Sequence, residues 1–185
     1  MPIGSFAVVP ELVQALLYAQ PRSVLDLGLG FGGGGVLVRE WLDLGVRPWR
    51  TYLVGVECWA DYRNPVWDLY DVVYLQTMEQ FLEHSQQQFD VVLLSDVLEH
   101  FERPEGEWLL NKSMNVVAPG GQLFVTTPAT FFPQDASHGN EREQHRVFWS
   151  EEDLRRFQFT VRRVGSPDYY CGESWLASWR NGSGR

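Results

Sequence analysis

Apolar and polar positions along the chain follow two alternating patterns. Short apolar runs predict strands, and between them apolar residues recur at helical spacing. Strands that alternate with helices imply parallel pairing through right-handed crossovers, with helices on both faces of one sheet. The predicted strands are residues 23–27, 51–56, 72–75, 89–94 and 122–127.

The stretches between the strands predict helices of ordinary length. Pro21 ends the first helix, and Pro104 opens the last of this series, which carries apolar residues as far as Val117. Pro119-Gly120-Gly121 predicts a turn before the fifth strand. The other helices are expected at residues 10–20, 34–44 and 78–84.

The alternation stops after the fifth predicted strand. Residues 128–149 show no clear period, and loops of that length are uncommon unless they are functional. Ser150 then has the features of a helix cap, because acids follow it in the first turn and arginines stand near the end. Residues 159–164 and 169–179 predict a closing antiparallel pair, and residues 181–185 a tail.

Composition limits the classes of function. The 185 residues have the length of one domain, and the net charge of −9 argues against general nucleic-acid or anionic-membrane binding. The two cysteines, Cys58 and Cys171, form no Cys-x-x-Cys pair and build no disulfide framework. Without the features of a signal peptide or an apolar run of membrane-spanning length, a soluble cytoplasmic protein is expected.

The segment 24–32 reads Val-Leu-Asp-Leu-Gly-Leu-Gly-Phe-Gly, a strand that runs into a glycine-rich turn. Glycine accepts the positive φ of a tight strand-to-helix turn and lets a ligand approach the backbone. The helix that follows offers unpaired N–H groups and the positive end of its dipole. The segment therefore predicts a ligand site at Gly28 and Gly30.

Polar residues stand where the predicted strands end. Ligands of open α/β sheets bind at the carboxyl ends of the strands, so these residues are expected to share one site. An acid at the end of the second strand can accept hydrogen bonds from ribose hydroxyls, which predicts a nucleoside ligand. The strand-end residues are Asp26, Glu57, Gln76-Thr77-Met78 and Ser95-Asp96.

These motifs, in this order, resemble those of the class I S-adenosylmethionine-dependent methyltransferases from about residue 20 to about residue 165. Val24–Gly32 resembles the glycine-rich first motif, and Glu57 matches the ribose-binding acid. Phe89–His100 resembles the fourth motif, Phe-Asp-x-x-x-x-x-Asp-Val-Leu-Glu-His. Val117–Pro128 resembles the fifth-strand motif.

Gly139-Asn140, His145 and Trp149 resemble a loop pattern of short, stand-alone bacterial and archaeal members of that family. The resemblance implies a doubly wound, mostly parallel, seven-stranded α/β sheet of the Rossmann-like methyltransferase fold, with a closing antiparallel hairpin. Length and pattern together predict one domain over residues 1–185, with a helix in residues 1–20 and a substrate loop over residues 128–149.

By the same resemblance, the cofactor is S-adenosylmethionine and its product S-adenosylhomocysteine. Gly28 and Gly30 would pass under the methionine part, and Asp26 would orient its amino group. Glu57 would hold the ribose. The remaining implied contacts are Leu29 in the glycine turn, Cys58 and Trp59 beside the adenine, Thr77 and Met78 at its edge, and Ser95 at the amino end.

Methyl transfer is an in-line displacement, and a base at the acceptor assists a hydroxyl nucleophile. The candidate bases are Asp96, His100, His138 and His145. His145 is favoured as base or substrate ligand, because it lies in the loop that should cover the pocket. A hydrogen-bonded loop histidine at 145, and a packing or capping role at 100, remain the structural alternatives.

The Asp-x-x-Glu-His spacing could also gather a divalent ion at Asp96, Glu99 and His100. Some quinone-pathway methyltransferases resemble this arrangement. No metal site is assigned, because a further protein ligand is not evident. The aromatic loop residues either line an acceptor pocket or form a small core of the loop: Phe131, Phe132, Phe148 and Trp149.

Other nucleotide-binding classes fit less well. A short-chain dehydrogenase needs Tyr-x-x-x-Lys, but Trp108 stands four residues before Lys112, the only lysine. The Gly-Lys-Ser/Thr of a phosphate-binding loop and the Asn/Asp-Pro-Pro-Tyr of amino-adenine DNA methyltransferases are absent. We therefore expect a methyltransferase for a small-molecule or glycan acceptor, at oxygen rather than nitrogen. A non-catalytic cofactor-binding scaffold or partner subunit with this fold is the alternative.

Overall fold

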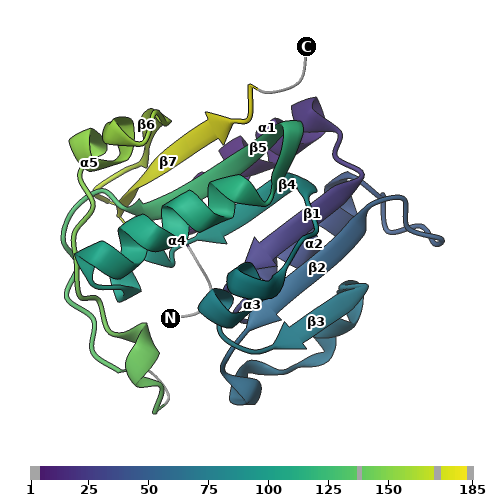
Figure 1. Cartoon of the computed structure of the whole chain (residues 1–185), viewed down its shortest axis with the longest axis horizontal. Coiled ribbons are helices and arrows are strands. Elements are labelled where there is room, and N and C mark those ends of the chain that lie inside the picture. The colour runs from purple at the N-terminus through teal and green to yellow at the C-terminus, as the bar shows by residue number, and fades with distance from the viewer. Residues whose placement is uncertain (1–4, 137–138, 169–171, 183–185) are drawn as a thin grey trace.

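Seven strands form one sheet in the computed structural model, which describes residues 5–136, 139–168 and 172–182. Their order is β3-β2-β1-β4-β5-β7-β6, and only β7 runs antiparallel to its neighbours β5 and β6. This confirms the predicted doubly wound sheet with its closing antiparallel hairpin (Figure 1). The strands are β1 (Ser23–Leu27), β2 (Tyr52–Glu57), β3 (Val72–Leu75), β4 (Phe89–Ser95), β5 (Val117–Pro128), β6 (Thr160–Gly165) and β7 (Glu173–Arg180).

Helices cover both faces of the sheet, as Figure 1 shows with α4 in front of the strands and α1 behind them. One apolar core joins α3, α4 and α5 to the sheet, and a second joins α1 and α2 to its other face. No helix in the described ranges combines the length and apolarity that crossing a membrane requires. The α-helices are α1 (Val9–Ala19), α2 (Gly33–Trp41), α3 (Met78–His84), α4 (Arg103–Asn115) and α5 (Glu151–Arg156).

Two caps fix where short helices begin. The Thr77 hydroxyl accepts the amide of Gln80 at the start of α3, and Ser150 does the same for Asp153 at the start of α5. In both, the third helical residue returns a hydrogen bond to the cap, which satisfies a second amide. The predicted cap at Ser150 is confirmed.

The short 3-10 helices are η1 (Phe6–Val8), η2 (Ala60–Tyr62), η3 (Pro65–Leu69), η4 (Leu98–His100) and η5 (Glu141–Glu143).

Three predicted boundaries were wrong around β5. Val117 opens β5 instead of continuing α4, and the predicted turn at 119–121 lies inside the strand. The pairing of β4 with β5 shifts register here, and Gly120 has a φ of 81°, so a bulge absorbs the glycines. Asn181 was expected in a free tail, but its amide donates to Gly121 O at 3.0 Å and extends the pairing of β7.

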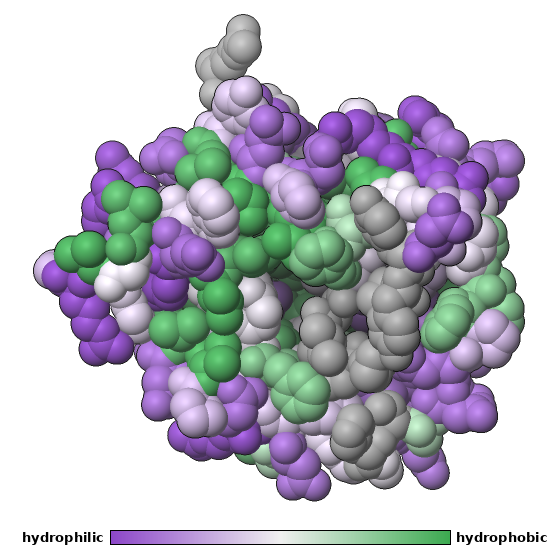
Figure 2. All heavy atoms as spheres, turned by 180° about the vertical axis from the view of Figure 1, so that it is seen from behind, coloured by the Kyte–Doolittle hydropathy of each residue, from purple (hydrophilic) through white to green (hydrophobic). Residues whose placement is uncertain are grey.

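The face that carries α1 and α2 leaves apolar side chains open to solvent. Figure 2 shows this face, where apolar residues lie among polar ones. The exposed apolar side chains of α2 and the segment after it are Val36, Trp41, Leu44 and Val46.

Trp149 anchors the far end of the 128–149 loop in the core. Its indole is fully buried, its Nε1 donates to Leu98 O at 3.1 Å, and the Arg103 guanidinium stacks on the ring at 4.2 Å. Gly106 of α4 makes room for it, because a Cβ there would lie 2.4 Å from Cζ2 of the indole. Trp149 therefore belongs to the core and not to an acceptor pocket, whereas Phe131 of the same loop is exposed.

Candidate functional site

The turn after β1 brings bare backbone to the carboxyl edge of the sheet. Gly28 and Gly30 have φ angles of 76° and 53°, which L side chains rarely adopt. A Cβ at Gly28 would also lie 2.8 Å from Cγ2 of Val97, and one at Gly34 would lie 2.4 Å from Oδ2 of Asp26. The glycines therefore allow both the turn and the close packing around Asp26.

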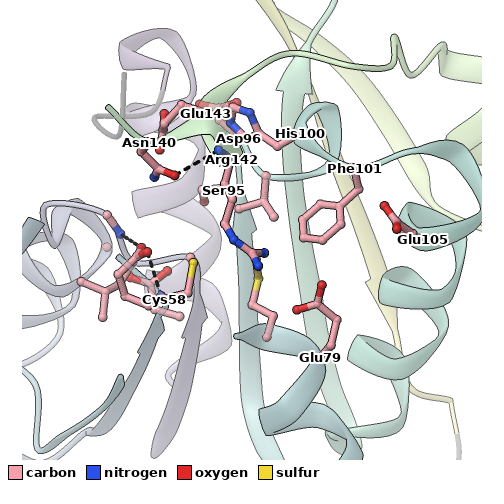
Figure 3. Close-up of a pocket in the computed structure, with 18 of the residues that line it drawn as sticks. Cys58, Glu79, Ser95, Asp96, His100, Phe101, Glu105, Asn140, Arg142 and Glu143 are labelled. Atoms are coloured by element: carbon pink, nitrogen blue, oxygen red, sulfur yellow. Dashed lines mark hydrogen bonds between the residues drawn. The ribbon is translucent and has the colours of Figure 1, made fainter. Parts of the chain in front are cut away.

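A cavity of about 470 Å³ opens above this turn, and the 128–149 loop forms one of its walls (Figure 3). Three residues expected at the site do not line it, namely Trp59, Thr77 and His145. The expected residues that do line it are Asp26, Gly28, Leu29, Gly30, Glu57, Cys58, Met78, Ser95, Asp96 and His100.

Glu57, at the end of β2, is held by backbone amides. Its Oε2 accepts a hydrogen bond from Gly30 N at 3.0 Å, and its Oε1 accepts from Cys58 N at 2.8 Å and Trp59 N at 2.9 Å. Three donors fix the carboxylate in one orientation and tie the glycine turn to the loop after β2. Carboxylate oxygens keep further acceptor capacity, so Glu57 can still receive donors from a ligand.

Asp26, at the end of β1, is held by a tyrosine that sequence analysis missed. The Tyr70 hydroxyl donates to Oδ2 of Asp26 at 2.6 Å and accepts the Gly35 amide at 2.9 Å. Burial raises the pKa of Asp26 to about 6; the nearby charge of Glu57 adds to this, and the Tyr70 hydrogen bond opposes it. The carboxylate is thus ionised at neutral pH and is available to a cationic group.

The residues expected beside an adenine differ in their placement. Cys58 lines the cavity, and burial raises the pKa of its thiol to about 11, so it is a neutral contact surface and not a nucleophile. Trp59 packs against the core under α2, and Thr77 is engaged as the cap of α3. Met78, the first residue of that helix, faces the cavity instead.

Asp96 follows β4 in a left-handed conformation with a φ of 51°. Its carboxylate accepts hydrogen bonds from Ser5 N and from the Thr126 hydroxyl, the latter at 3.0 Å. Burial raises the pKa of Asp96, and these two donors oppose that rise. Both carboxylate oxygens are therefore engaged within the protein.

The two described candidate histidines lie together but face different spaces. Their rings are 5.0 Å apart between centroids; His100 lines the large cavity, whereas His145 lines a small neighbouring one with Glu99. Burial lowers the pKa of His100 to about 4 and also lowers that of His145, so both rings are neutral at pH 7. The third candidate, His138, lies outside the described residues.

Charged side chains of the loop complete the cavity. Arg142 extends from η5 into the space between Cys58 and Phe101, as Figure 3 shows. Sequence analysis did not single out the charged residues of this loop. The only signal for them was the high density of charged residues in a long loop. The charged residues that line the cavity besides those already named are Glu79, Glu105, Glu141, Glu143 and Arg146.

The family described as methyltransferase domain matches residues 6–158. The chain belongs to this family. The resemblance read from the motifs of β1, β2 and β4 is thereby confirmed, and the methyltransferase domain accounts for most of the described chain.

Two curated relatives share part of the sequence. The human mitochondrial ubiquinone biosynthesis O-methyltransferase is 30% identical over 109 residues, which cover 56% of this chain and 28% of the relative. The ubiquinone biosynthesis O-methyltransferase of Klebsiella pneumoniae is 28% identical over 118 residues, covering 57% of this chain and 42% of the relative. The chain therefore spans less than half the length of either relative.

Solved structures share the fold at low sequence identity. A 1,6-didemethyltoxoflavin-N1-methyltransferase of Burkholderia thailandensis, with S-adenosylhomocysteine bound, has a TM-score of 0.66 at 20% identity and covers 95% of this chain and 79% of its own. The N-methyltransferase NodS of Bradyrhizobium japonicum, also with S-adenosylhomocysteine, has a TM-score of 0.62 at 17% identity. The match covers 93% of this chain and 86% of the NodS chain.

Proposed function

We propose that this methyltransferase domain uses S-adenosylmethionine to methylate an oxygen atom of a small molecule. The observation that carries the proposal is that the glycine turn, Asp26 and Glu57 all line one cavity of about 470 Å³. Methyltransferase neighbours with bound S-adenosylhomocysteine support the choice of cofactor. When bound, S-adenosylmethionine supplies an electrophilic methyl group on its sulfonium.

The residues present fit this cofactor at three points. Glu57 is fixed by three amides and can accept hydrogen bonds from two ribose hydroxyls. Asp26, ionised above about pH 6, can pair with the ammonium of the methionine part. Gly28 lines the cavity without a side chain, so the chain of the cofactor can pass close to its backbone.

An oxygen acceptor is favoured by two observations. Both curated relatives are named as O-methyltransferases. The wall of the cavity away from the glycine turn is polar, with Asp96 and His100 beside the residues of η5. We propose that the acceptor binds against this wall, and that the loop side chains, Arg142 among them, hold it and keep water out.

The proposal is tested by incubating the protein with methyl-labelled S-adenosylmethionine and a panel of acceptors. The panel contains phenols, hydroxy acids, free sugars and primary amines of similar size, and mass spectrometry locates the added methyl group. O-methyl products are expected. They should vanish with Gly30→Arg, because the arginine side chain would fill the cavity at the glycine turn. N-methyl products alone would contradict the oxygen assignment, and cofactor binding without turnover on the whole panel would favour a non-catalytic scaffold.

A further inference from the structure

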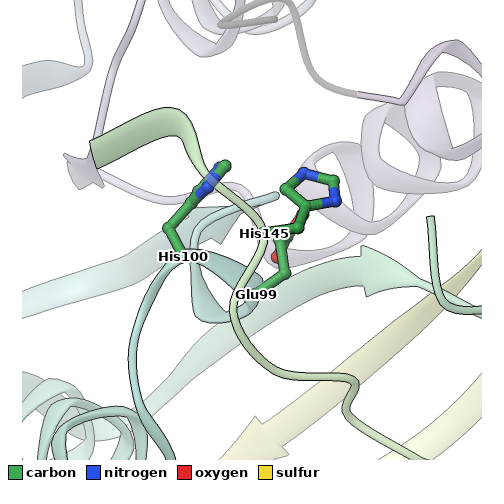
Figure 4. Close-up of side chains that lie close together, drawn as sticks. All are labelled: Glu99, His100 and His145. Carbon is green, nitrogen blue, oxygen red and sulfur yellow. The ribbon is translucent and has the colours of Figure 1, made fainter. Parts of the chain in front are cut away.

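Three side chains that can ligate metals converge beside the large cavity. Glu99 and His100 lie on η4 directly after β4, and His145 reaches them from the 128–149 loop (Figure 4). One ligating atom from each lies within 4.8 Å of the others. His145 therefore takes the place that the spacing gave to Asp96, whose carboxylate is turned to Ser5 and Thr126.

Both imidazoles are oriented by backbone carbonyls. Nδ1 of His145 lies 2.6 Å from Phe132 O, and Nδ1 of His100 lies 3.3 Å from Gln144 O. A carbonyl oxygen only accepts, so each Nδ1 must carry the hydrogen, and each Nε2 keeps its lone pair. Metal-ligating histidines are held in this way, with the second ring nitrogen donating to a carbonyl or carboxylate.

Glu99 brings a buried carboxyl group to the same place. The residue is 3% exposed, and the Thr127 hydroxyl donates to its Oε2 at 3.0 Å. Within the described part of the chain, no lysine, arginine or histidine forms an ion pair with this carboxylate. A buried carboxyl group is costly to ionise without a cationic partner, and a bound cation would supply that partner.

We propose that Glu99, His100 and His145 form a binding site for a divalent transition-metal ion, with Zn²⁺ as the preferred occupant. Two imidazoles and one carboxylate are the donor set of many three-ligand zinc sites, and this set leaves a further coordination position open. Zinc ligands lie about 2.0–2.2 Å from the ion, so the three atoms must draw together by roughly 1 Å on binding.

The site is tested with the metal alone. Protein freed of metal by a chelator is titrated with Zn²⁺ by calorimetry, and with Co²⁺ followed by visible absorption. We expect one ion per chain and a Co²⁺ spectrum of low coordination number. His100→Gln and His145→Gln should each weaken Zn²⁺ binding by at least about tenfold. The matched control is His84→Gln, because His84 is an exposed histidine of α3 outside the cluster.

The outcomes separate clearly. Saturable binding that both cluster variants weaken and His84→Gln leaves unchanged would support the site. An affinity that survives both cluster variants, an equal loss in His84→Gln, or no Zn²⁺ binding to the wild type would overturn it. Circular dichroism confirms that each variant is folded. S-adenosylhomocysteine titration of the metal-free protein tests the proposed function independently, so that the two failures can be told apart.

Discussion

Tyr70 donates a 2.6 Å hydrogen bond to Asp26 across 44 positions of sequence. The same hydroxyl accepts the amide of Gly35 in the first turn of α2, at 2.9 Å. One phenol thus ties together the end of β1, the start of the helix after the glycine turn and the segment before β3. Because Tyr70 is itself buried, this contact fixes the direction of the Asp26 carboxylate.

Tyr70→Phe tests this contact. The variant loses the donor to Asp26 and leaves the Gly35 amide unpaired, which should lower the free energy of unfolding by about 1–3 kcal/mol. Affinity for S-adenosylhomocysteine should fall about five- to tenfold, because Asp26 is no longer oriented. Chemical denaturation and calorimetry measure the two effects. Tyr52→Phe is the control, because Tyr52 is a partly exposed tyrosine at the start of β2. Unchanged affinity in a destabilised Tyr70→Phe would mean that the contact is structural only.

Asp26→Asn should raise the stability of the protein at neutral pH and weaken its binding of S-adenosylhomocysteine. The folded protein raises the pKa of Asp26 from 3.8 to about 6, so between these values the folded state binds more protons than the unfolded state. Stability therefore falls as pH rises through that window, by up to about 3 kcal/mol for this group. Asparagine removes this penalty, so the variant should melt above the wild type at pH 7.5, and the difference should shrink towards pH 4.

The same variant should bind S-adenosylhomocysteine more weakly, because a neutral amide cannot pair with an ammonium. Thermal unfolding across the pH range and calorimetry at pH 7.5 check the two halves of this prediction. A melting temperature below that of the wild type at every pH would show that burial does not penalise the charge of Asp26.

Gly106→Ala tests the anchor of the loop. The added Cβ would lie 2.4 Å from the buried indole of Trp149, so the ring must shift. Overpacking of this kind costs about 1–3 kcal/mol, more than the gain of up to about 1 kcal/mol from alanine in a helix. Stability and cofactor affinity should both fall, because the loop forms a wall of the cavity. Glu107→Ala, the exposed neighbour on α4, should change stability by no more than about 0.5 kcal/mol.

Sequence predicted most accurately where local signals agree with the fold. The predicted strand 72–75 and helix 78–84 match β3 and α3 to the residue. The strand-end acids Asp26 and Glu57 were located because parallel strands bring their carboxyl ends to one edge. Val117 was misassigned, because a bulge depends on pairing with a distant strand.

The contacts made across the sheet could not be predicted from local pattern. Nothing near Tyr70 in the sequence points to Asp26, and nothing near His145 shows that it faces Glu99 instead of the large cavity. Trp149 was expected among the aromatic residues of the loop. In the structure it packs into the core, in the space left by the missing side chain of Gly106 on α4. Such partners are set by tertiary packing over long separations.

Titration of the protein with S-adenosylhomocysteine by calorimetry tests the central claim most directly. We predict saturable binding of one ligand per chain, abolished by Gly30→Arg and weakened by Glu57→Gln about tenfold or more, because the amide cannot accept from all three backbone donors. Glu105→Gln, a carboxylate of the opposite wall, should change the affinity by less than about twofold. A folded wild-type protein that binds no S-adenosylhomocysteine at millimolar concentration would contradict the account.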